Sequence, residues 1–261
     1  MATTRAIAAP RTILHTRGSW SARDDRTPSA VWLGIWWVGL IAGFGVDIPR
    51  YFHENPAAPL IVHVHGAIFT VWTLLITAQV LLVVRDRVAL HRKLGWLLAA
   101  WACVMAVMGP VAIMASEAAN IQGGPVYDPP FIAIAFENIL CFVALVAWGM
   151  ALRKNPAAHR RIMILTCVAI ADPGFARFTG WIWPQPPTSM LVYFVYTFYG
   201  NMLLIAFMTA WDWYRGRLMR QFVFGAAGLL AAEFSATLLY FWAPWRAVST
   251  SWVMAWARHF G

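Results

Sequence analysis

The chain has 261 residues, of which 61% are hydrophobic and only 12% are charged, whereas about 25% of the residues in a soluble domain are charged. This composition excludes a soluble multidomain protein and indicates an integral membrane protein whose main partner is the lipid bilayer. The net charge of +9 does not point to nucleic acid, because the basic residues form short clusters between long apolar runs, as they do where they orient helices in a membrane.

Residues 1–29 carry five arginines but no continuous apolar core, so we interpret them as a basic cytoplasmic arm and not as a signal peptide. Seven apolar runs follow, each close to the length of about 20 residues that crosses a bilayer. They are Val31–Ile48, Leu60–Val84, Leu94–Ala115, Pro130–Leu152, Arg161–Trp183, Ser189–Tyr214 and Phe222–Ala243. Residues 244–261 place tryptophans at helical spacing and are expected to form an aromatic-rich helix in the membrane interface.

The predicted fold is therefore all-α: a polytopic membrane helical bundle with seven transmembrane helices in one domain, residues 30–243. Basic residues are concentrated in the loops after the second, fourth and sixth runs, whereas the loops "SEAANIQGGPVYDP" and "WPQPPTS" contain none. Because positively charged loops stay in the cytoplasm, we expect a cytoplasmic N-terminus and a C-terminus outside. The predicted location is the inner (plasma) membrane, as a multi-pass protein.

Two similar phrases, "VALHRKLGWLL" and "PAAHRRIMILT", place a histidine and two basic residues at the start of the third and fifth runs. Asp86 is expected to cap the third helix, and Asn155 with Pro156 to cap the fifth. The positive end of each helix dipole and the basic neighbours disfavour a charged imidazole at His91 and His159. Neutral imidazole is the form that binds metal ions.

The two phrases have an alternative explanation as ordinary interfacial residues that set the membrane orientation. If His91 and His159 are instead a ligand pair, the arginines that follow them, Arg92 and Arg160, are placed to meet the propionates of a haem.

The position of the two histidines resembles one ligand pair of the transmembrane b-type cytochromes of the ascorbate-reducing class. "LHRKLGW" is similar to the histidine-then-glycine helix start of that class, here His91 and Gly95. The resemblance covers Leu60–Trp183 and implies a four-helix core that binds haem b. That class holds a second haem between its second and fourth helices. Here the second run offers His63 and His65 but the fourth has no histidine, so one haem at most is expected.

The chain also resembles uncharacterised bacterial multi-spanning membrane proteins with histidine–arginine phrases before apolar runs, a likeness that implies no activity.

Four ionisable side chains lie in the middle or outer half of the apolar runs, namely Glu137, Asp172, Arg177 and Glu233. A charge at this depth costs several kcal/mol unless it is paired or neutralised. Asp172 and Arg177 share a run that is interrupted by "DPG", and we expect them to form a buried ion pair.

The second run adds a histidine to this outer half. His63 and His65 lie about 200° apart on a helix, and His63 is expected to face inward because it continues into a small, polar stripe. A metal site formed by His63, Glu137 and Glu233 is one interpretation of the outer cluster. A pocket that moves protons or binds a polar ligand is another, and a purely structural hydrogen-bond network is the third.

Two classes of function remain. The first is an integral membrane electron-transfer protein with one b-type haem near the cytoplasmic side, whose partner is a redox protein or a quinone. The second is a haem-free transporter or sensor that uses the outer carboxylate and histidine cluster, or a metal-dependent membrane enzyme with that cluster as its site. A retinal protein is excluded, because the only lysines, Lys93 and Lys154, lie in loops.

Overall fold

The computed structural model describes residues 25–54, 57–121 and 127–260, and within these residues the chain is helical without strands. Most of the predicted basic arm, residues 1–24, lies outside this described part. The helices are α1 (Arg26–His53), α2 (Leu60–Val84), α3 (Val88–Ala119), α4 (Ile132–Ala151), α5 (Pro156–Val168), α6 (Asp172–Ile182), α7 (Met190–Tyr214), α8 (Arg220–Phe241) and α9 (Ala243–Phe260), with short 3-10 turns η1 (Pro129–Phe131) and η2 (Leu152–Lys154).

The prediction of an all-α bundle is confirmed. In the part of the chain that the structure describes, six helices are long and apolar enough to cross a membrane, as in a multi-pass membrane protein. The fifth predicted run is not one straight helix, because α5 and α6 meet at a bend of 41° and make a seventh span only when taken together. Proline and glycine directly after Asp172 explain the break, since Pro173 has no N–H to continue the hydrogen bonds of α5.

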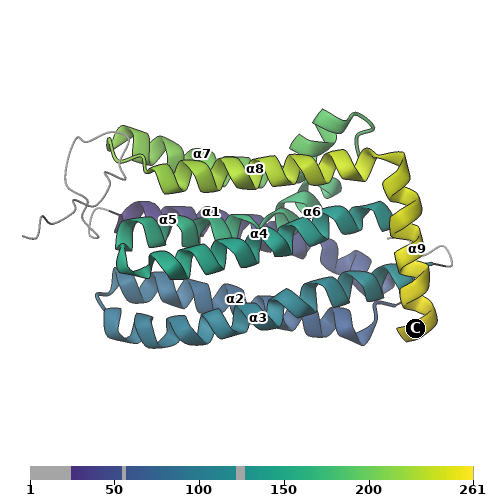
Figure 1. Ribbon diagram of the computed structural model, residues 1–261, viewed down its shortest axis with the longest axis horizontal. Helices are drawn as coiled ribbons and strands as arrows, with labels where there is room; N and C mark the ends of the chain where they lie inside the picture. Colours follow the sequence, from purple (N-terminus) through teal and green to yellow (C-terminus); the bar gives the residue numbers. More distant parts are fainter. Residues whose placement is uncertain (1–24, 55–56, 122–126, 261) are drawn as a thin grey trace, which may run out of the picture.

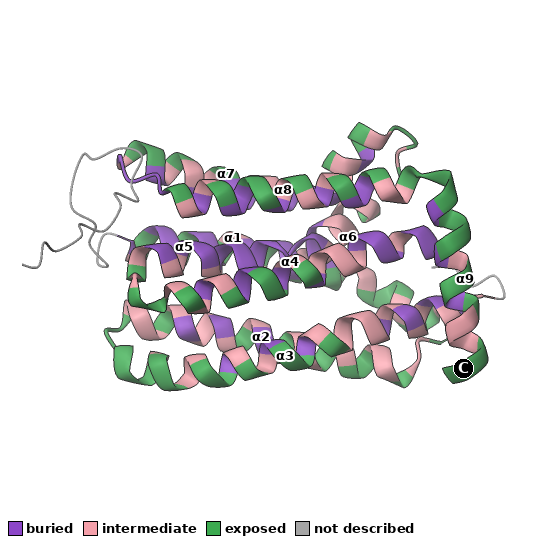
Figure 2. Cartoon of the chain, in the orientation of Figure 1, coloured by how far each residue is buried: buried purple, intermediate pink, exposed green. Residues whose placement is uncertain are grey.

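The long helices run side by side in three layers (Figure 1). The middle layer contains α1, α4, α5 and α6, with α7 and α8 on one side of it and α2 and α3 on the other. Buried residues are most frequent in the middle layer, while α2 and α3 are mostly half-buried or exposed (Figure 2), as expected of helices that face lipid. The predicted helix over 244–261 corresponds to α9, which crosses one end of the bundle against α3 and α8.

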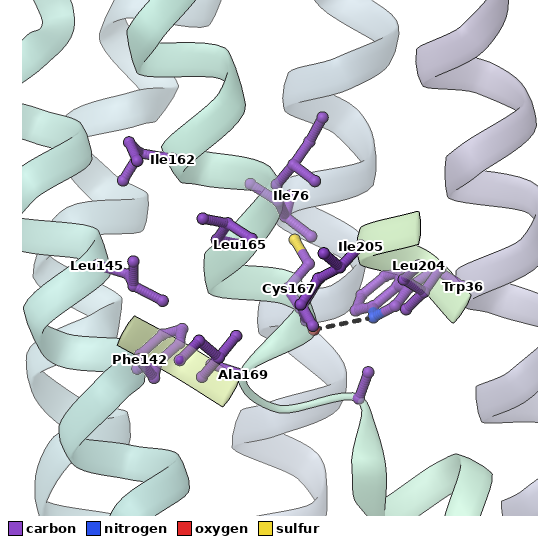
Figure 3. Packing of buried hydrophobic residues seen from close by; sticks show 14 of the residues in the cluster. Trp36, Ile76, Phe142, Leu145, Ile162, Leu165, Cys167, Ala169, Leu204 and Ile205 are labelled. Carbon is purple, nitrogen blue, oxygen red and sulfur yellow. Dashed lines mark hydrogen bonds between the residues drawn. The ribbon is translucent and has the colours of Figure 1, made fainter. Parts of the chain in front are cut away.

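Small residues bring α1 and α6 into backbone contact. A Cβ atom added at Gly43 would lie 1.7 Å from the Gly174 carbonyl oxygen, and one added at Gly39 would meet the Phe175 ring. Gly39 and Gly43 therefore allow the close approach of the two helices. Just before the bend, the Trp36 indole donates a hydrogen bond of 3.1 Å to the carbonyl of Cys167, inside the apolar packing shown in Figure 3.

One of the two predicted helix caps is confirmed. The Asn155 side chain accepts a hydrogen bond from the Ala158 N–H at 3.3 Å, and Pro156 occupies the first turn of α5. The prediction for Asp86 is wrong. This residue has a φ of 59° in the tight turn before α3, and its carboxylate is paired with Arg26 at the start of α1, so it makes no cap on α3.

Candidate functional site

His91 of α3 and His159 of α5 meet at the end of the bundle opposite to α9. Their ring centroids are 6.3 Å apart and the ring planes are inclined by 81°. Each histidine lies in the first turn of its helix. The two histidines meet because α3 and α5 begin at the same end of the bundle. The predicted meeting of the two histidines is thus present in the structure.

The orientation of His159 is set by the end of α4. Its Nδ1 donates a hydrogen bond of 2.7 Å to the Gly149 carbonyl oxygen, because a carbonyl can only accept. The neutral ring then carries its proton on Nδ1 and has a free lone pair on Nε2. Histidines that bind metals are commonly held in this way, with the second nitrogen donating to a carbonyl or carboxylate.

The orientation of His91 depends on Gln79 of α2, a buried residue. When the amide nitrogen points toward His91, it donates to Nδ1 and to the His91 carbonyl oxygen, while the amide oxygen accepts from the Gly95 N–H at 2.8 Å. In this orientation both ends of the Gln79 amide are satisfied, and Nδ1 of His91 is the acceptor. Sequence reasoning missed the role of Gln79, and its signal was a buried amide in an otherwise apolar run.

An ionic network of Asp25, Arg160, Arg161 and Asp212 lies beside the histidines. Arg161 is only 2% exposed and binds Asp212 through two hydrogen bonds of 2.7 and 2.6 Å. Asp25 lies 3.1 Å from Arg161 and 3.3 Å from Arg160. Two arginines were predicted to meet haem propionates. Arg160 forms an ion pair with Asp25, and Arg92 is exposed.

A second polar group, which we call the carboxyl cluster, lies inside the bundle and consists of Glu137, Asp172 and Glu233 with the amides of Asn138 and Asn201. The Asn138 Nδ2 donates to both oxygens of Asp172, each at 3.0 Å. The Asn201 Nδ2 donates to Glu233 Oε1 at 2.7 Å. Asp172 and Glu233 thus accept hydrogen bonds from amide groups and not from arginines.

The predicted ion pair between Asp172 and Arg177 is wrong. The Arg177 guanidinium donates to Asp47 of α1 at 3.0 Å and to the Pro173 carbonyl at 2.8 Å. The reason is helix geometry: five positions along a helix place two side chains about 140° apart. Asp172 therefore faces α4 while Arg177 faces α1.

The predicted metal site is not formed either. His63 is exposed and hydrogen-bonded to Tyr51 at 2.8 Å, so it does not face inward as expected. His65 is the half-buried member of the two, with its ring 4.1 Å from that of Phe69. Among the described residues no three histidine, cysteine, aspartate or glutamate side chains are arranged to hold a metal ion. His63, Glu137 and Glu233 therefore do not form a metal site.

Comparisons with protein-family models, with curated proteins and with solved structures find no match to this chain. The functional conclusion therefore depends on the chain's own residues.

Proposed function

We propose that this chain is an integral membrane electron-transfer protein that binds one b-type haem through His91 and His159. The distance between the two rings supports this assignment. Because an imidazole nitrogen binds a metal ion at about 2 Å, two rings a few ångströms apart are close enough to hold one ion between them. The observed separation is 6.3 Å.

The surroundings of the two rings suit ligands. His159 already donates its Nδ1 proton to Gly149, which leaves Nε2 free to bind. Gln79 lies against Nδ1 and the carbonyl oxygen of His91 and accepts from the Gly95 N–H, so it fixes the position of the His91 ring. A haem bound here would supply one-electron oxidation and reduction, while the chain orients the ligands and excludes water.

Basic side chains are available for the haem propionates. Arg160 directly follows His159 and is half-buried, and Arg92 directly follows His91. Arg160 also contacts Asp25, so in this proposal it divides its hydrogen bonds between an aspartate and a propionate. Arginine suits that role because its five N–H groups point in several directions.

We place the protein in the inner (plasma) membrane with the histidine end toward the cytoplasm. The support is the charge of the loops, because the basic clusters follow α2, α4 and α7 and positive loops remain cytoplasmic. An electron donor or acceptor on that side, such as a redox protein or a quinone, would then reach the haem over a short distance.

The test is a visible spectrum of the full-length protein, purified from cells supplied with a haem precursor. We expect a Soret band in the oxidised protein and sharp low-spin bands on reduction. His91→Ala and His159→Ala should each remove these bands or convert them to a high-spin form. His259→Ala, at the far end of α9, is the control and should leave the spectrum unchanged. A wild-type protein without a chromophore, or a spectrum that survives both ligand replacements, would refute the assignment.

A further inference from the structure

Glu233 of α8 and Asn201 of α7 are joined by one hydrogen bond, and each has a second polar atom without a partner among the described residues. Both residues are fully buried. The Asn201 Nδ2 donates to Glu233 Oε1 at 2.7 Å, whereas Glu233 Oε2 and Asn201 Oδ1 have no hydrogen-bond partner. Asn201 is a neutral residue, and its free oxygen belongs to the same amide that binds Glu233.

A proton on Glu233 Oε2 would give both open oxygens a partner. The carboxyl group then donates O–H to Asn201 Oδ1 while it accepts N–H from Asn201 Nδ2, as in a cyclic acid–amide pair. An ionised Glu233 is acceptor-only, so its Oε2 would face another acceptor in a buried place. Leaving a buried polar group without a partner costs about 1–3 kcal/mol, and more when that group is charged.

Glu137 of α4 has the same need for a proton. Neither of its oxygens has a well-formed hydrogen bond, and the polar group beside it is the thiol of Cys141, a weak donor. The carboxyl groups of Glu137, Asp172 and Glu233 are close enough to repel one another. Three negative charges in this place would therefore be strongly unfavourable.

Asp172 has the most hydrogen-bond donors of the three carboxyl groups. It receives two hydrogen bonds from Asn138 and is the first residue of α6, where the helix dipole stabilises an anion. Arg177 also acts on Asp172, although its own hydrogen bond goes to Asp47. Glu233 accepts one hydrogen bond, Glu137 has none from a strong donor, and neither lies at a helix start, so the two glutamates are less suited than Asp172 to carry a negative charge.

We infer that Glu137 and Glu233 form a proton-binding site inside the bundle, in which each glutamate takes up and releases one exchangeable proton on a carboxylate oxygen. The groups that face this glutamate pair are Cys141 of the same helix as Glu137, Asp172 of α6 and Asn201 of α7. Glu137 precedes Gly149, the partner of His159, by 12 residues on α4, or about 18 Å along the helix. The glutamate pair is therefore separate from the histidine site, and this inference holds with or without a haem.

The test is infrared spectroscopy of the full-length protein in lipid vesicles during a pH titration. The carbonyl band of protonated carboxylic acids should be present in wild type and should weaken as the pH rises. Glu233→Gln and Glu137→Gln should each remove part of this band. Glu117→Gln is the matched control, because Glu117 is also buried but binds the Asp128 N–H near α9; it should retain the component lost in Glu233→Gln.

The variant Asn201→Ala is a second test by the same infrared measurement, and it retains both glutamates. It should shift the frequency of the Glu233 component, because the hydrogen bond to Oε1 is lost. The proposal fails if Glu137→Gln with Glu233→Gln leaves the titrating band intact, or if Asn201→Ala leaves its frequency unchanged. It also fails if the band responds to the exchange of sodium for potassium and not to pH, because the ligand would then be a metal cation.

Discussion

The ionic network at the histidine end and the carboxyl cluster in the middle of the bundle are both buried, but their carboxyl groups are stabilised by different partners. In the network, Asp212 is paired with Arg161 through two short hydrogen bonds. In the cluster, Asp172 and Glu233 are paired with the amides of Asn138 and Asn201. Charge is therefore matched by opposite charge at the helix ends, whereas in the interior it must be matched by neutral donors and protons.

The largest expected effect is the loss of a charge from the network. Arg161→Ala leaves Asp212 and Asp25 without their shared guanidinium, and removal of one partner from a buried pair typically costs about 3–5 kcal/mol. We expect a large fall in the thermal midpoint of the purified protein, or a failure to accumulate in the membrane. Arg153→Ala is the control, because that arginine is exposed, donates to a backbone carbonyl and lies over the ring of Trp96. Equal stability of the two variants would contradict the comparison.

The second expected effect concerns the backbone contact between α1 and α6. Gly43→Ala places a methyl group against the Gly174 backbone, which cannot move away as a flexible side chain would. We expect a destabilisation of about 1–3 kcal/mol from overpacking, measured as a lowered thermal midpoint. Gly45→Ala, two residues along the same helix with nothing within 4 Å of the added carbon, should be neutral or stabilising by up to about 1 kcal/mol. A reversal of this order would mean that the helices are not in backbone contact.

The smallest expected effect is the most informative for the comparison. Glu233→Gln keeps the oxygen that accepts from Asn201 and adds an N–H that can donate to its free oxygen, so it imitates a protonated glutamate. We expect its free energy of unfolding to lie within about 1 kcal/mol of wild type. Asp212→Asn is the matched neutralisation in the network and should cost clearly more, because buried Arg161 loses the carboxylate that holds it through two hydrogen bonds and keeps only Asp25. Similar losses in both variants would show that Glu233 is ionised in the folded protein.

The sequence predicted well those features that depend on neighbouring residues. The apolar runs marked the long helices, "DPG" marked the break between α5 and α6, and the two histidine phrases marked a shared end of the bundle. The cap at Asn155 followed from its place directly before Pro156. Each of these depends on a few adjacent residues, so composition and helical spacing were enough to predict it.

The features that were missed depend on which helix lies opposite. Arg177 shares a helix with Asp172 but turns toward Asp47 of α1, and no rule of spacing within one helix identifies a partner 130 residues away. The choice between His63 and His65 failed for a related reason, since the small, polar stripe below His63 does not face the interior. Gln79 was overlooked because a buried amide shows its purpose only when His91 is seen beside it.

The crossing helix α9 has a consequence for the order in which the protein assembles during translation. Trp245 of α9 donates a hydrogen bond of 2.9 Å to the Pro130 carbonyl in η1, and Val253 is buried with Met114 of α3. These partners are synthesised more than 100 residues before α9. That end of the nascent bundle therefore stays uncovered until α9 leaves the ribosome, so the membrane insertion machinery must tolerate an open bundle that is closed from one side only.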